Sequence, residues 1–230
     1  MNYEWLIFSL GLLGIWLVIF ISKPAVRKEM FWVSLFTMPF GLTEPLFVPE
    51  YWNPPSLFNL AARTGFDIES LIFCFAVGGI GAVLYEGIVG AEHLKMGEME
   101  MHSRRHRFHR LALTSPIIVF LLIAVFTSLN PIYSASIAMF TGGVATILCR
   151  PDLNRKLWVG GGLFLAIYFV FFFLFNLVYP GMVQEVWNLP AISGILILGV
   201  PLEELMFAFT FGMMWSSVYE HILWYRLKEM

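Results

Sequence analysis

Long apolar stretches, interrupted only by short charged clusters, restrict what this chain can fold into. Hydrophobic residues make up 59% of the 230 residues and charged residues only 13%, whereas an ordinary soluble domain carries about 25% charged residues. A soluble domain of this size could not bury so much apolar surface. The sequence therefore predicts an all-α integral membrane protein without a soluble domain. The net charge of -2 gives no indication of a nucleic-acid partner.

The apolar stretches are long enough to predict individual membrane spans. A helix needs roughly 20 apolar residues to cross the core of a bilayer. Seven segments reach or approach this length, namely 4–22, 31–49, 68–90, 111–129, 131–149, 157–179 and 201–225. We interpret the first as a retained helix, because no small-residue cleavage site follows it and Lys23 comes after the apolar run rather than before it.

Basic residues occupy every second connection between these spans. The basic connections contain Lys23, Arg27, Lys28, Lys95, Arg104, Arg105, Arg107, Arg110, Arg150, Arg155, Lys156, Arg226 and Lys228, and the opposite set contains only Arg63. Basic loops face the cytoplasm. In a prokaryote, this pattern places the N-terminus outside the cytoplasmic membrane and the C-terminus in the cytoplasm.

The basic connection at 92–110 also holds four of the five histidines. These are His93, His102, His106 and His109. Their spacing matches no familiar metal site, so we interpret this connection as a solvated loop beside anionic lipid. No metal site is expected.

Two parts of the chain resemble each other. Residues 66–86 align without gaps on residues 200–220, and Trp52-Asn53 matches Trp187-Asn188 with a slip of one residue. The aligned pairs are Glu69 with Glu203, Phe73 with Phe207, Gly78 with Gly212, and Glu86 with Glu220. This predicts two parallel three-helix repeats joined by a connector helix. The parts are 1–90, 91–130 and 131–230, all within one membrane domain, and the cavity between the copies is the expected site.

Several carboxylates lie within or at the ends of the spans. Acids inside a membrane are costly and usually face the interior of a bundle. We expect function from Glu44 and from the Glu203-Glu204 pair, which Pro201 places in the first turn of a helix. For the other acids, a functional and a structural role both stay open. The structural role would be helix capping for Asp67 and Glu69, and pairing with basic loop residues for Glu86 and Glu220.

Buried acids of this kind suit one class of chemistry. A carboxyl group in an apolar cavity favours its neutral form and can donate a proton, while a second carboxylate can stabilise positive charge. Protonation of an alkene followed by carbocation rearrangement uses both. Aromatic faces also attract cations. For most of the phenylalanines in the sixth span, however, we expect contact with lipid: Phe169, Phe171, Phe172, Phe173 and Phe175.

The second copy resembles a known family. Pro201-Leu202-Glu203-Glu204-Leu205-Met206-Phe207 is similar to the Pro-x-Glu-Glu-x-x-Phe signature of the lycopene cyclase domain. That family comprises small membrane carotenoid cyclases built from two similar three-helix halves, separate or fused. The first copy departs from the signature, with Asp67-Ile68-Glu69-Ser70 in the corresponding place.

The resemblance implies an acid-initiated, non-redox cyclisation of a linear carotenoid end group to a six-membered ring. It implies that Glu203 and Glu204 are the leading acid and charge stabiliser, with Glu69 as the counterpart and Glu44 in support. We expect further substrate contacts from Asp67, Phe73, Phe207, Trp52, Trp187, Asn53 and Asn188. No cofactor is needed. The expected partners are a lipophilic carotenoid and membrane lipid, and both a homo-oligomer and association with other carotenoid-pathway enzymes are compatible with the sequence.

Other classes of membrane protein fit less well. A retinal protein needs a lysine in its last span, but no lysine lies inside any predicted span. Diphosphate chemistry needs aspartate-rich motifs, but Asp67 and Asp152 are the only aspartates. Intramembrane glutamate proteases have an arginine where this chain has Ala208. A carotenoid- or isoprenoid-binding protein without cyclisation, and a proton-coupled transporter, remain as alternatives.

Overall fold

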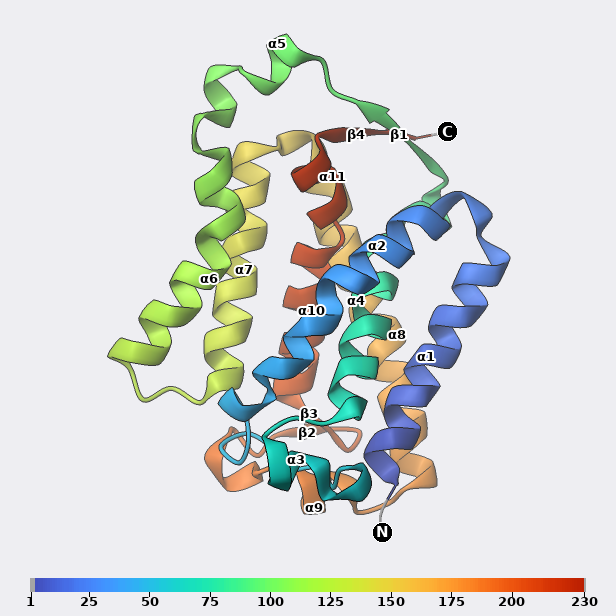
Figure 1. Cartoon of the computed structure of the whole chain (residues 1–230), viewed down its shortest axis with the longest axis vertical. Coiled ribbons are helices and arrows are strands. Elements are labelled where there is room, and N and C mark those ends of the chain that lie inside the picture. The colour runs from blue at the N-terminus through green and yellow to red at the C-terminus, as the bar shows by residue number, and fades with distance from the viewer. Residues whose placement is uncertain (1–2, 230) are drawn as a thin grey trace.

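The computed structural model describes residues 3–229 as a bundle of helices along one long axis (Figure 1). Five helical segments of the described chain are long and apolar enough to cross a membrane. Their α-helices are α1 (Glu4–Ser22), α4 (Ile68–Val89), α6 (His109–Phe126), α7 (Pro131–Cys149) and α8 (Asn154–Val178). These correspond closely to five of the predicted spans, which confirms the helical, apolar character expected of a membrane protein.

The predicted span 31–49 contains two types of helix. It consists of α2 (Arg27–Thr37) followed by the 3-10 helix η2 (Met38–Leu46). Pro39 and Pro45 lie in the second part, and because proline lacks the backbone donor and crowds the preceding turn, a regular α-helix does not continue through them.

The predicted span 201–225 is also interrupted. It consists of α10 (Leu202–Trp215) and α11 (Val218–Leu223), separated at Ser216-Ser217. Neither segment 31–49 nor segment 201–225 is therefore one long α-helix, and the count of seven spans stays a prediction.

Short elements connect the long helices. The short helices are η1 (Pro24–Val26), η3 (Leu57–Asn59), α3 (Leu60–Thr64), α5 (Glu98–Met101), η4 (Arg104–Phe108), η5 (Pro151–Leu153), α9 (Met182–Val186) and η6 (Leu189–Ala191). The strands are β1 (Ala91–Lys95), β2 (Leu196–Ile197), β3 (Val200–Pro201) and β4 (Tyr225–Glu229). The β2 and β3 strands pair antiparallel just before α10.

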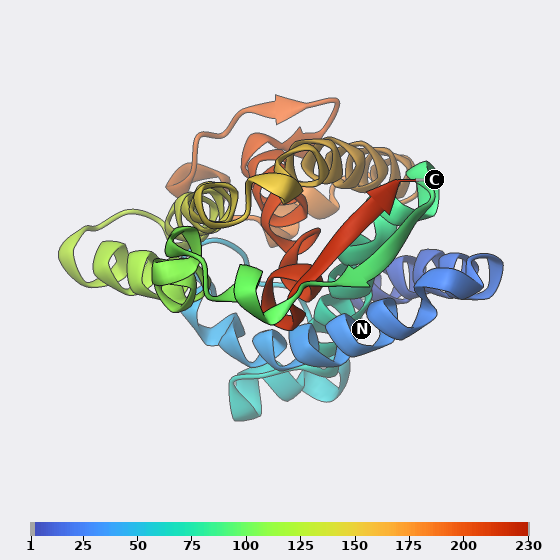
Figure 2. The same cartoon turned by 90° about the horizontal axis from the view of Figure 1, so that it is seen from above.

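A two-stranded sheet, which the sequence analysis does not anticipate, joins the C-terminus to the basic loop. β1 pairs antiparallel with β4, with Ala91 opposite Glu229 and Lys95 opposite Tyr225. Figures 1 and 2 show this sheet at the end of the bundle that also carries α5. The N-terminus, α3 and α9 lie at the opposite end.

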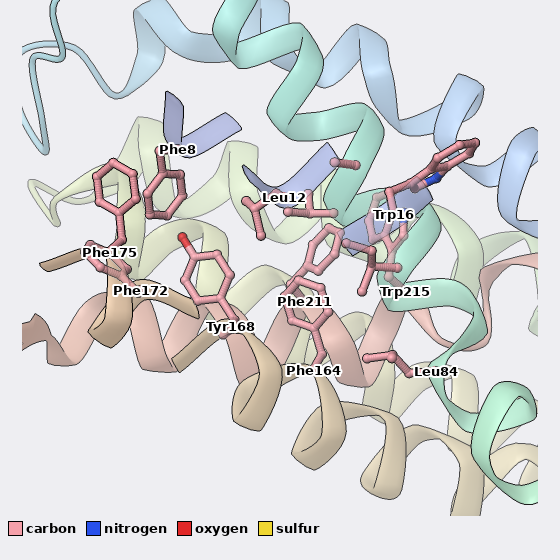
Figure 3. Close-up of a cluster of buried hydrophobic side chains, with 14 of the residues drawn as sticks. Phe8, Leu12, Trp16, Leu84, Phe164, Tyr168, Phe172, Phe175, Phe211 and Trp215 are labelled. Carbon is pink, nitrogen blue, oxygen red and sulfur yellow. The ribbon is translucent and has the colours of Figure 1, made fainter. Parts of the chain in front are cut away.

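One face of α1 forms a large part of the core. Trp5, Phe8, Leu12 and Trp16 recur at helical spacing and are buried. Figure 3 shows three of these side chains facing rings of α8 and α10. Phe172 and Phe175 are also buried, so the expectation of lipid contact is wrong for these two, because α1 covers that face of α8.

The two similar segments approach each other at one end of the bundle. Trp52 and Trp187 form an isolated antiparallel bridge, with their ring centroids 5.7 Å apart. Gly78 and Gly212 each allow a neighbouring helix to approach, at Thr37 of α2 and at Phe164 of α8 respectively. The repeat architecture itself stays a prediction.

Candidate active site

Glu204 accepts three hydrogen bonds in the interior of the bundle. Its Oε1 atom accepts from the Tyr51 hydroxyl at 2.5 Å and from the Trp187 indole at 3.0 Å, and its Oε2 atom accepts from the Tyr168 hydroxyl at 2.7 Å. The first turn of α10 positions the carboxyl, and its three donors come from three other segments of the chain. Hydrogen bonds of this kind favour the charged form of a carboxylate.

Glu203, the neighbouring residue, faces a different environment. Its Oε1 atom accepts from the Tyr133 hydroxyl at 2.5 Å and from the backbone N–H of Ser193 at 2.9 Å. Glu69, its counterpart in the first copy, accepts from the backbone N–H of Leu57 at 2.6 Å. Each of these two glutamates therefore holds the loop that precedes its own helix.

Glu44 is buried without such donors. It is 5% exposed, and neither of its carboxyl oxygens has a hydrogen-bond partner among the described residues. The carboxyl of Asp67 interacts with it electrostatically. Asp67 also caps α4, because its Oδ1 atom accepts from the backbone N–H of Ser70 at 2.5 Å, and this agrees with the cap alternative.

An apolar cavity of about 550 Å³ brings Glu44 and Glu204 to one space. This volume is within the usual range for small-molecule pockets, about 300–1,000 Å³. Among the other predicted site residues, Trp52, Phe73 and Phe207 line the same cavity. Its remaining walls include side chains of η2, α4, α6, α7, α8 and α10.

The other predicted site residues lie outside this lining. They are Glu69, Glu203, Asp67, Trp187, Asn53 and Asn188. The two asparagines join the matched segments, because the backbone N–H of Asn53 donates to Val186 and that of Asn188 donates to Tyr51. Trp187 acts through its hydrogen bond to Glu204. The roles of all these residues in substrate binding or catalysis stay predictions.

Two tyrosines that contact Glu204 are not indicated by any sequence pattern. Tyr51 and Tyr168 are each 3% exposed and lie far from Glu204 in the chain. A tyrosine in an apolar segment is typical of membrane interfaces, so no local pattern distinguishes these two from interfacial anchors. Their common partner is visible only in the fold.

A cluster of buried charges lies at the other end of the bundle. The Lys156 ammonium contacts Glu86, and it donates to Glu220 at 2.7 Å and lies 3.7 Å from Glu29. His93 lies 2.6 Å from Glu220. The structure therefore agrees with the basic-partner alternative for Glu86 and Glu220, although Lys156 is buried rather than solvated.

Two groups of side chains have the donor atoms for a metal ion. One consists of Glu29, Glu86, His93 and Glu220, and the other consists of His109, Cys149 and His221. The Lys156 ammonium already occupies the first group, where it neutralises part of the negative charge. The second group contains no lysine.

One family model matches part of the chain. Residues 130–222 match the family model described as lycopene cyclase. This region contains α7, α8 and α10, and thus Glu203 and Glu204. No curated protein and no solved structure matches the chain.

Proposed function

We propose, from the lycopene cyclase family domain that this chain carries in residues 130–222, that the protein cyclises the end group of a linear carotenoid. The substrate is a lipophilic polyene taken from the membrane. The observation that supports this proposal best is the shared apolar cavity of Glu44 and Glu204. It combines a buried acid that accepts no hydrogen bond from the described residues, a second acid that accepts three, and aromatic walls.

Glu44 is the proton donor in this proposal. Neither of its carboxyl oxygens accepts a hydrogen bond from the described residues, and the Asp67 carboxyl interacts with it electrostatically. Two neighbouring carboxyls in an apolar environment retain a proton between them, because both cannot be ionised at low cost. The pair therefore supplies an acid inside the cavity.

Glu204 stabilises the positive charge that follows. Its three donors hold it in place as a carboxylate. The rings of Phe73, Phe207 and Phe211 also line the cavity, and aromatic faces stabilise a desolvated cation by about 2 kcal/mol or more. Charge stabilisation in a preorganised, water-poor site lowers the barrier of such a step.

The reaction is balanced without an external reagent. The Glu44 proton adds to the terminal double bond and leaves a tertiary cation, which the π electrons of the next double bond attack to close a six-membered ring. A carboxylate then removes a proton from the ring, and a new double bond forms. Because a proton is added and a proton is lost, the net reaction is an isomerisation that needs no redox cofactor.

The membrane setting follows the sequence prediction. We propose seven crossings of the cytoplasmic membrane, with the N-terminus outside and the C-terminus inside, and a pseudo-twofold arrangement of the two copies. The antiparallel pairing of Trp52 with Trp187 supports this arrangement, because a twofold axis brings equivalent residues together. In this setting the protein contacts a second copy of itself or other carotenoid-pathway enzymes.

Pigment analysis tests this function directly. The chain is expressed in a bacterium that accumulates lycopene, together with Glu44→Gln and Glu204→Gln. We expect cyclic products from the natural sequence and at least a 100-fold lower yield from either variant. Glu185→Gln is the matched control, because Glu185 is exposed and outside the cavity lining.

The outcomes separate the alternatives. Unchanged lycopene, with the protein folded in the membrane, contradicts lycopene cyclisation. Pigment that co-purifies unchanged with the protein favours a binding protein instead. Full activity of Glu44→Gln contradicts the assigned donor, and the same experiment with Glu203→Gln then tests the neighbouring acid.

A further inference from the structure

Three helices bring two histidines and a cysteine together beside the cavity, whose lining includes His221. His109 lies at the start of α6, Cys149 at the end of α7, and His221 in α11. All three are buried, and their ligand atoms lie within 4.8 Å of one another. His106 of η4 also contacts Cys149. The proposed cyclisation uses none of these side chains.

The separations fit a tetrahedral metal centre. The Cys149 sulfur lies 3.6 Å from the Nδ1 atom of His106 and 3.6 Å from the Nδ1 atom of His109. Zinc binds cysteine sulfur at about 2.3 Å and histidine nitrogen at about 2.0–2.1 Å, so tetrahedral geometry places the two donors about 3.6 Å apart. A single thiol hydrogen can serve only one of the two rings.

His221 provides an independent indication of a ligand. Its Nδ1 atom lies 3.2 Å from the Thr146 hydroxyl, while its Nε2 atom is buried without a hydrogen-bond partner among the described residues. Metal-bound histidines use this arrangement, in which one ring nitrogen is fixed by a hydrogen bond and the other binds the ion. An unpaired buried polar atom otherwise costs free energy.

The surrounding charges permit a cation at this position. Arg150 follows Cys149, but its guanidinium donates to Asp152 at 2.9 and 2.6 Å and to the Tyr225 carbonyl at 2.6 Å. The Asp152 carboxylate therefore offsets part of its charge. A cysteine thiolate would also offset part of the charge of a divalent ion.

We propose that His109, Cys149 and His221 bind a zinc ion. Nitrogen and sulfur donors in a tetrahedral set select zinc over magnesium or calcium, which prefer oxygen. The ion would join α6, α7 and α11 at one point. Because α6 packs chiefly against α7, this link would fix the outermost helix of the cavity wall.

The metal content of the purified protein tests this proposal, and the test does not depend on cyclisation activity. The full chain is purified in detergent, loaded with zinc and dialysed against a weak chelator, and we expect it to retain one zinc per chain. Cys149→Ser and His221→Gln should each lower zinc affinity by at least 10-fold, in line with loss of a ligand. Cys74→Ser is the matched control, because Cys74 is the other cysteine and lies outside the group.

Cobalt substitution identifies the ligand set even if a variant folds poorly. The natural sequence loaded with cobalt should show thiolate-to-metal charge-transfer absorption, which Cys74→Ser should keep and Cys149→Ser should lose. Folded protein that binds no metal overturns the proposal. Equal binding by Cys149→Ser, or binding abolished only by Glu29→Gln, also overturns it, since the ion would then lie elsewhere.

Discussion

Two acids that line one cavity differ in what surrounds each carboxyl. Glu204 accepts hydrogen bonds from two tyrosines and a tryptophan, whereas Glu44 accepts none within the described chain. Similar side chains can therefore perform opposite tasks, because hydrogen bonding stabilises the charged form and apolar burial stabilises the neutral form. The adjacent Glu203 serves its own loop through Ser193.

Tyr168→Phe tests the role of one donor to Glu204. The variant keeps the buried ring but removes a hydrogen bond to a charged acceptor, worth about 1.5–3 kcal/mol. If that bond stabilises the cation indirectly, cyclisation should slow by roughly 10- to 100-fold, as measured by product formation from lycopene in proteoliposomes. Tyr179→Phe is the control, because Tyr179 is only half-buried, and an equal loss there would contradict the assignment.

At the scale of elements, glycines set how closely α4 packs. A side chain at Gly79 would overlap Ser34 of α2 and Trp16 of α1, whose side chains form a hydrogen bond of 2.8 Å. Close approach through small residues is a general means of helix association in membranes. This supports the interpretation that the glycine-rich stretch of α4 serves packing.

Gly79→Ala should therefore destabilise the bundle. Overpacking typically costs about 1–3 kcal/mol. We therefore expect a lower midpoint of thermal unfolding in detergent, measured as the loss of the helical circular dichroism signal. Gly162→Ala provides the comparison, because a side chain there meets open space. A Gly79→Ala variant as stable as Gly162→Ala would show that the helices separate without cost.

The buried charge cluster links further elements, since Lys156 of α8 contacts Glu86 of α4 and Glu220 of α11. Lys156→Met should leave these acids without their ammonium partner and lower stability by about 3–5 kcal/mol. Thermal unfolding in detergent measures the change. The exposed Lys23 is the control position, and a Lys156→Met midpoint equal to that of Lys23→Met would contradict the prediction.

At the scale of the whole molecule, the chain separates its basic connections from its acid-rich site. The connections that contain β1, β4 and η5 lie at one end of the bundle, and α3 and α9 lie at the other (Figure 1). Such separation suits the proposed orientation, with basic loops in the cytoplasm. The interrupted segments 31–49 and 201–225 each lack a single α-helix long enough to cross a bilayer.

Reporter fusions measure the orientation. Alkaline phosphatase is active only outside the cytoplasm, so a fusion after residue 63 should be active and one after residue 99 inactive. Green fluorescent protein at the C-terminus should fluoresce. An inactive fusion after residue 63 would show that segment 31–49 does not cross.

The sequence predicts the long helices better than the site. The boundaries 4–22 and 131–149 coincide with α1 and α7, because apolar length and the Asn130-Pro131 start are local properties. The environment of Glu204 depends on three residues remote from it in the chain. Likewise, histidine spacing within 92–110 gives no indication of Cys149 or His221, which other helices supply.

The cavity wall formed by η2 and α6 has a consequence for how the protein encounters its substrate. Side chains on this wall, such as Phe40, Ile117 and Leu121, are apolar and exposed, so they would face acyl chains rather than water. A polyene could then enter sideways while staying dissolved in lipid. Its search would be confined to two dimensions, and turnover would follow the amount of pigment per lipid rather than its concentration in the cell.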